Sequence, residues 1–130
     1  MHRQVDLALL VDDSDVDLFI QKRFIEIAGF AKTIKACNSP SQAIRYLQEN
    51  EIIPEIIFLD LNMPDMDGFA FMDKFLQLPR KIHELVKVVV LTSSSNHSDK
   101  KRAEKYSSIT NFLSKPLSLE ALEDLRQNMK

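Results

Sequence analysis

The sequence predicts an α/β fold with a doubly wound, parallel sheet of five strands. Three short apolar runs lack polar alternation, which is typical of strands buried on both faces of a parallel sheet. Amphipathic stretches separate these runs, so the 130 residues form a (βα)5 pattern, a β-strand and an α-helix repeated five times. Strands that alternate with helices predict helices on both faces of the sheet. The length favours one domain, residues 1–130.

The strands are predicted from apolar runs of strand length. The three strong runs are Val5–Val11, residues 55–61 and residues 87–91. Two weaker runs, residues 31–36 and 111–114, suit the edges of the sheet. Cys37 follows the first of these weaker runs, and we expect it to be a small buried side chain rather than a redox group.

The helices are predicted from three-and-four spacing and from their capping residues. Asp15–Ala28 carries such a series and is followed by Gly29, a typical residue after a helix C-terminus. The members of this series are Val16, Phe19, Ile20, Phe24 and Ile27. Ser39 to Gln42 form a capping box with proline at the first helical position. Further helices are predicted over residues 68–78, ended by Pro79, over 99–106, and after the N-cap Ser118.

Composition excludes several classes of protein. Seventeen Lys and Arg against nineteen Asp and Glu give a net charge of −2, which argues against a nucleic-acid-binding protein. One cysteine rules out an intrachain disulfide and a four-thiolate zinc site. Two glycines exclude a glycine-rich phosphate-binding loop. No run approaches the length of a membrane helix or resembles a signal peptide, so we expect a soluble protein of the reducing cytoplasm.

Polar residues follow four of the predicted strands. Strand ends of a parallel sheet meet at one edge, which is where ligands of such folds bind. The residues at that edge are Asp12 and Asp13, Asp60 with Asn62 two residues on, Thr92, and Lys115. Taken singly, each has an ordinary explanation as a helix cap, a turn residue or a solvated lysine. Their joint placement favours a functional site.

These residue types suit phosphoryl chemistry. Clustered carboxylates repel one another, and a divalent cation relieves that repulsion. Oxygen ligands without histidine or cysteine favour Mg²⁺, with Mn²⁺ possible. Lys115 and Thr92 would stabilise phosphoryl oxygens, and a carboxylate can itself become an acyl phosphate.

Two longer motifs resemble the receiver domain of two-component response regulators. They are Leu10-Val11-Asp12-Asp13-Ser14 and the segment from Phe58 to Gly68, which reads Phe-Leu-Asp-Leu-Asn-Met-Pro-Asp-Met-Asp-Gly. Thr92-Ser93 and Lys115-Pro116 complete the pattern, and the similarity extends from Val5 to Met129. The set resembles the CheY-like, stand-alone receivers in particular. This resemblance implies a flavodoxin-like strand order of 2-1-3-4-5.

The resemblance assigns a role to each site residue. Asp60 would be phosphorylated by the phosphohistidine of a sensor histidine kinase, with Lys115 and Thr92 contacting the phosphoryl group. Phe112 would act with Thr92 as the switch aromatic. The ligands of Mg²⁺ would be Asp12 through water, Asp13, Asp60 and the carbonyl of Asn62. The Lys115–Pro116 bond would be cis, and the side chains of Asn62 and Ser94 would tune autodephosphorylation.

The predicted function is therefore a signalling switch rather than an enzyme with turnover on external substrates. Only Lys130 follows Met129, so we expect output through a protein partner, or relay of the phosphoryl group to a histidine phosphotransfer protein. The resemblance puts the partner surface on the fourth helix, fifth strand and fifth helix, and we expect a monomer or weak dimer.

Two alternatives stay open: a receiver fold that docks without phosphorylation, and a Mg²⁺-dependent phosphohydrolase. The intact acidic set weighs against the first alternative, and Asn62, which cannot serve as a general acid, weighs against the second. The sequence departs from the family pattern at Ser108-Ile109. The fourth helix is unusually basic, which we interpret first as a solvated face and second as a docking face for an acidic partner.

Overall fold

The computed structural model describes residues 4–49, 51–63, 67–93 and 97–129. In this part of the chain, five parallel strands form one sheet in the order β2-β1-β3-β4-β5. The strands are β1 (Val5–Val11), β2 (Ala31–Cys37), β3 (Ile56–Asp60), β4 (Lys87–Thr92) and β5 (Ile109–Ser114). The helices are α1 (Asp15–Ala28), α2 (Pro40–Glu49), α3 (Gly68–Phe75), α4 (Arg80–His83), α5 (His97–Ala103) and α6 (Leu119–Asn128). The predicted fold class and strand order are confirmed.

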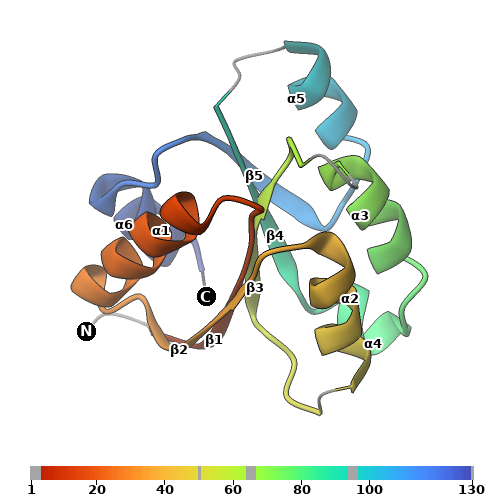
Figure 1. Cartoon of the computed structure of the whole chain (residues 1–130), viewed down its shortest axis with the longest axis horizontal. Helices are drawn as coiled ribbons and strands as arrows, with labels where there is room; N and C mark the ends of the chain where they lie inside the picture. The colour runs from red at the N-terminus through yellow and green to blue at the C-terminus, as the bar shows by residue number, and fades with distance from the viewer. Residues whose placement is uncertain (1–3, 50, 64–66, 94–96, 130) are drawn as a thin grey trace.

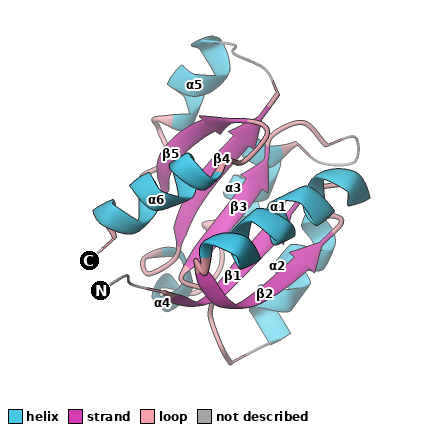
Figure 2. Cartoon of the chain, turned by 90° about the vertical axis from the view of Figure 1, so that its left-hand side faces the viewer, coloured by secondary structure: helices cyan, strands magenta, loops and turns pink. Residues whose placement is uncertain are grey.

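Helices cover both faces of the sheet. Figure 1 shows α1 and α6 on one side of the strands and α2, α3 and α4 on the other. Figure 2 shows α1 and α6 lying across the sheet face, with α5 beyond the upper end of the strands. The central strands are almost fully shielded, and every residue of β3 is buried. Burial on both faces explains why these strands are apolar runs without alternation.

The helix ends follow the capping residues that the sequence offers. Ser14 Oγ accepts a hydrogen bond from the Asp17 N–H, and Ser118 Oγ accepts one from Ala121. Gly29 has φ 61° and ψ 33°, the left-handed conformation that closes α1. Ser39 Oγ accepts from the N–H of Gln42, as the capping box predicts.

Only part of the apolar series predicted for α1 faces the core, where Phe24 packs partly buried. Val16, Phe19 and Ile27 are 68%, 66% and 58% exposed. The buried face carries Leu18, Gln21 and Ile25 instead. A second series with nearly the same spacing lies one residue away, so periodicity located the helix without fixing its orientation.

The bounds of three further elements differ from the sequence prediction by more than one residue. The helix predicted over 68–78 ends at Phe75, and Pro79 then precedes the separate short helix α4. The helix predicted over 99–106 is α5, which begins and ends earlier. The last strand begins at Ile109, two residues before the predicted start. Cys37 is fully buried at the end of edge strand β2, and this burial raises the pKa of its thiol.

Candidate functional site

The carboxyl ends of β1 and β3 bring three aspartates together. Val11 pairs with Leu59 in the sheet, so Asp12 and Asp60, one residue further along each strand, lie side by side. One carboxylate oxygen each from Asp12, Asp13 and Asp60 lie within 4.8 Å of one another. Asp12 is 1% exposed and Asp60 4% exposed, whereas Asp13 faces solvent.

Asp12 is held by the start of α1. Its Oδ1 accepts a hydrogen bond from the N–H of Ser14 at 2.9 Å, and its Oδ2 accepts one from Gln21 Nε2 at 3.0 Å. The backbone N–H of Asp12 donates to the carbonyl of Cys37 at 3.1 Å. These bonds fix a buried carboxylate that would otherwise be costly.

Lys115 reaches the same cluster from the end of β5. Its Nζ lies 2.8 Å from Asp12 Oδ2 and 3.5 Å from Asp60 Oδ1. A third carboxylate oxygen, Asp17 Oδ2 on α1, also lies 2.8 Å away. Burial disfavours the charge on this ammonium, but the hydrogen bonds to Asp12 and Asp17 outweigh burial and raise the pKa of Lys115.

The backbone also fixes Lys115. Its N–H donates to the carbonyl of Thr92 at 2.8 Å, which joins the ends of β4 and β5. The peptide bond between Lys115 and Pro116 is cis. The lysine side chain is only 15% exposed, so its charge is directed into the acidic cluster.

Asp60 is the most perturbed carboxylate of the cluster. Burial, followed by the charge of Asp12, raises its pKa from 3.8 to about 6. The N–H of Asn62, which donates to Asp60 Oδ1 at 3.2 Å, and the charge of Lys115 act in the opposite direction. The charge of Asp13 adds a smaller increase. Asp60 is therefore half protonated at a pH of about 6 rather than near 3.8.

The remaining predicted site residues that the structure describes lie on β4 and β5 and directly after β3. Thr92 is buried at the end of β4, and its Oγ1 accepts a hydrogen bond from Asn62 Nδ2 at 3.2 Å. Phe112 of β5 is partly buried and packs against a cluster that includes Leu61 and Val90. Ser94 lies outside the described residues.

The residues present fit Mg²⁺. Three carboxylates converge without histidine or thiolate, and hard oxygen donors of this kind are what Mg²⁺ prefers. Burial first, and then the charge of Asp12, raises the pKa of Asp60, and the charge of Lys115 does not cancel these two effects. A divalent cation would supply the missing balance.

Sequence reasoning missed two residues of this site. Asp17 was one acidic residue in a run, and its contact with Lys115 joins positions 98 residues apart. Gln21 offered a signal: it lies between Leu18 and Ile25 at helical spacing, and a polar residue on a buried face requires a partner. That partner is Asp12.

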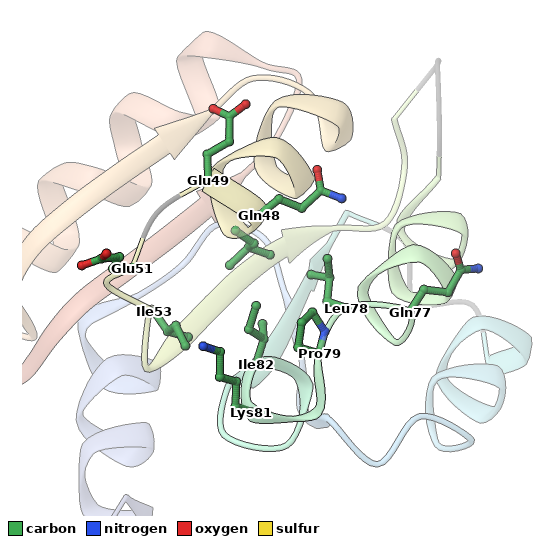
Figure 3. A pocket seen from close by; sticks show the side chains of 10 residues that line it. Gln48, Glu49, Glu51, Ile53, Gln77, Leu78, Pro79, Lys81 and Ile82 are labelled. Atoms are coloured by element: carbon green, nitrogen blue, oxygen red, sulfur yellow. The ribbon is translucent and has the colours of Figure 1, made fainter.

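A groove of about 790 Å³ lies away from the acidic cluster, between the end of α2 and the α3–α4 connection (Figure 3). Glu49, Gln77 and Lys81 line it together with apolar residues such as Ile53 and Ile82. Ile53 precedes β3, so the groove opens at the amino ends of the strands. It shares no residue with the aspartate cluster.

Known proteins match both the sequence and the fold. The profile of the response regulator receiver domain matches residues 8–127. The chain belongs to the response regulator receiver family. The receiver's described helices include none long and apolar enough to cross a membrane.

Individual relatives agree with this assignment. The probable methanogenesis regulatory protein FilR2 of Methanothrix harundinacea is 31% identical over 129 residues, covering 95% of this chain and 81% of FilR2. A crystal structure of a two-component response regulator from Cytophaga hutchinsonii is 31% identical, with a TM-score of 0.90 and 97% of each chain covered. The sensor histidine kinase CheAY of Helicobacter pylori is 28% identical over 89% of this chain, which spans only 14% of CheAY.

Proposed function

We propose that this receiver is a phosphorylation switch in which Asp60 accepts a phosphoryl group from a phosphohistidine. The donor would be a sensor histidine kinase or a histidine phosphotransfer protein. The observation that carries the proposal is the meeting of three carboxylates with Lys115 at one edge of the sheet. Asp60 is the natural acceptor, because hydrogen bonds and the ion pair with Lys115 already engage both oxygens of Asp12. The buried Asp60 carboxylate lies in the same cluster, 3.5 Å from the lysine ammonium.

The transfer is an attack of an Asp60 carboxylate oxygen on phosphorus. The P–N bond to the donor imidazole breaks, its electron pair returns to the nitrogen, and a P–O bond to Asp60 forms. Mg²⁺ would be held by Asp13, Asp60 and the Asn62 carbonyl, and by Asp12 through water, and would supply positive charge to the phosphoryl oxygens. Lys115 would pair with one of these oxygens.

Thr92 and Phe112 would transmit the effect of the phosphoryl group to the protein surface. The hydroxyl of Thr92 would leave Asn62 Nδ2 and donate to a phosphoryl oxygen. Phe112, already partly buried beside Val90, would fill the space that Thr92 vacates. This rearrangement would alter the surface formed by α5, β5 and α6 and so change its affinity for a protein partner.

The direct test is intact-protein mass spectrometry after incubation with acetyl phosphate and Mg²⁺. We expect one phosphoryl adduct on the native chain, dependent on Mg²⁺. Asp60→Asn should abolish the adduct, and Asp6→Asn, which changes an exposed aspartate on β1, should retain it. Chelation of Mg²⁺ should prevent the adduct on both proteins that keep Asp60.

An adduct on Asp60→Asn would contradict the assignment of the acceptor. No adduct on the native chain, together with no binding of beryllofluoride, would contradict phosphorylation altogether. That result would favour a receiver that docks without phosphorylation. Repeated release of phosphate from a small phosphoester would instead favour a phosphohydrolase.

A further inference from the structure

Lys115 contacts one carboxylate that does not belong to the aspartate cluster. Its Nζ is 2.8 Å from Asp17 Oδ2 and 3.5 Å from Asp60 Oδ1. The nearer partner is therefore on α1 rather than on the proposed acceptor. A lysine ammonium has three N–H donors. Asp12 and Asp17 each accept a hydrogen bond from Lys115, whereas Asp60 lies at ion-pair distance.

The start of α1 is built to hold Asp17 in this position. The backbone N–H of Asp17 donates to the N-cap Ser14 Oγ at 3.2 Å. One turn later, Gln21 is 3% exposed and donates to Asp12. One helix thus positions two carboxylates, Asp12 and Asp17, against the same ammonium.

We propose that Asp17 is a positioning residue that competes with the phosphorylated acceptor for Lys115. This inference rests on the proposed phosphorylation of Asp60. A phosphoryl group adds up to about two negative charges, and Lys115 must approach it closely to pair with it. Asp17 lies outside the metal-binding cluster, so its charge stays available to retain the ammonium. The contact between Asp17 and Lys115 therefore favours the unphosphorylated state.

The test is the affinity of the protein for beryllofluoride, a stable phosphoryl mimic, measured by calorimetry at saturating Mg²⁺. Asp17→Asn removes the competing charge while keeping the size of the side chain and the Ser14 cap. Asp15→Asn is the matched control, because Asp15 is exposed and also lies in the first turn of α1. Both variants remove the same favourable charge from the helix N-terminus.

We expect Asp17→Asn to bind beryllofluoride about fivefold more tightly than Asp15→Asn, the effect of one partly exposed ion pair. Asp17→Glu, which restores the charge, should return the affinity toward that of the native chain. Asp17→Ser removes the charge with a different side chain and should agree with Asp17→Asn. Thermal unfolding verifies that each variant is folded.

Equal affinities for Asp17→Asn and Asp15→Asn would overturn the competition, while the proposed function would stand. Weaker binding by Asp17→Asn would also overturn it, because Asp17 would then support Lys115 in the bound state. If the native chain binds no beryllofluoride and forms no adduct, the proposed function fails and the role of Asp17 fails with it.

Discussion

Replacing Asp60 by asparagine should stabilise the folded receiver near neutral pH in the absence of divalent cations. The pKa of Asp60 rises from 3.8 to about 6 because the carboxyl is buried beside Asp12. An ionised Asp60 is therefore less favourable in the folded state than in the unfolded chain. An asparagine at this position removes the charge and keeps a carbonyl oxygen that can accept the N–H of Asn62.

The pKa change sets the magnitude and the pH range of this effect. One pKa unit corresponds to about 1.4 kcal/mol, so the rise from 3.8 to about 6 costs the folded state about 3 kcal/mol above pH 6. Below pH 3.8 the group is protonated in both states and the cost disappears. The free energy of unfolding of the native chain is therefore not reduced by Asp60 in acid, and it falls as the pH rises through about 6. The new amide loses part of the hydrogen bonding of the carboxylate, which costs about 1 kcal/mol. The free energy of unfolding of Asp60→Asn should therefore exceed that of the native chain by about 2 kcal/mol at pH 7.5.

The assay is urea unfolding of the native chain and Asp60→Asn between pH 4 and pH 8 in the presence of a chelator. The difference in free energy of unfolding should move in favour of the variant between pH 4 and pH 6.5 and stay constant above that range. Asp15→Asn controls for loss of one carboxylate at an exposed position. A difference that does not change with pH, or a variant less stable at pH 7.5, would refute the reasoning.

Other substitutions test the neighbouring structure. Gly68→Ala should cost more stability in urea unfolding than Gly29→Ala, because its Cβ would lie 2.9 Å from Leu61 Cα, whereas the Cβ at position 29 meets nothing within 4 Å. Gly29→Ala should still cost about 1 kcal/mol, since φ is positive there, and equal losses would contradict this comparison. Arg126→Met should cost about 1–3 kcal/mol in the same assay, because its buried guanidinium donates to the last carbonyl of α1; an unchanged stability would show that the carbonyl does not need it. Asp13→Asn should weaken Mg²⁺ binding by at least about tenfold in calorimetry, and native affinity would exclude Asp13 as a ligand.

The sequence predicted the strands and the edge residues for the same physical reason. A strand buried on both faces has no polar positions until it ends, so the first polar residue marks the end of the strand. Asp12 and Asp60 are such residues, and parallel pairing of β1 with β3 brings them together. Lys115 follows the partly exposed edge strand β5 and was predicted from the resemblance to the family pattern as well as from its place at a strand end. Fold class and most of the acidic cluster were therefore accessible without coordinates.

The features that could not be predicted depend on which face of a helix is turned inward. On α1, the series containing Val16 and Phe19 and the series containing Leu18 and Ile25 have almost the same spacing. Hydrophobicity favoured the first series, but the second one is buried. The contact of Asp17 with Lys115 depends on the orientation of α1, so it could not be predicted while that orientation was unknown.

The unfavourable free energy of the ionised, buried Asp60 also favours the binding of a cation at this site. The strand that carries Asp60, β3, is fully buried and can support a charge arrangement that is unfavourable by itself. A cation that balances the Asp60 carboxylate recovers part of the same free energy on binding. Asp17 then limits how closely Lys115 can approach the acceptor, because the ammonium cannot pair fully with Asp17 and with Asp60 at the same time. The same carboxylates that destabilise the unliganded receiver thus give it a preference for the liganded state.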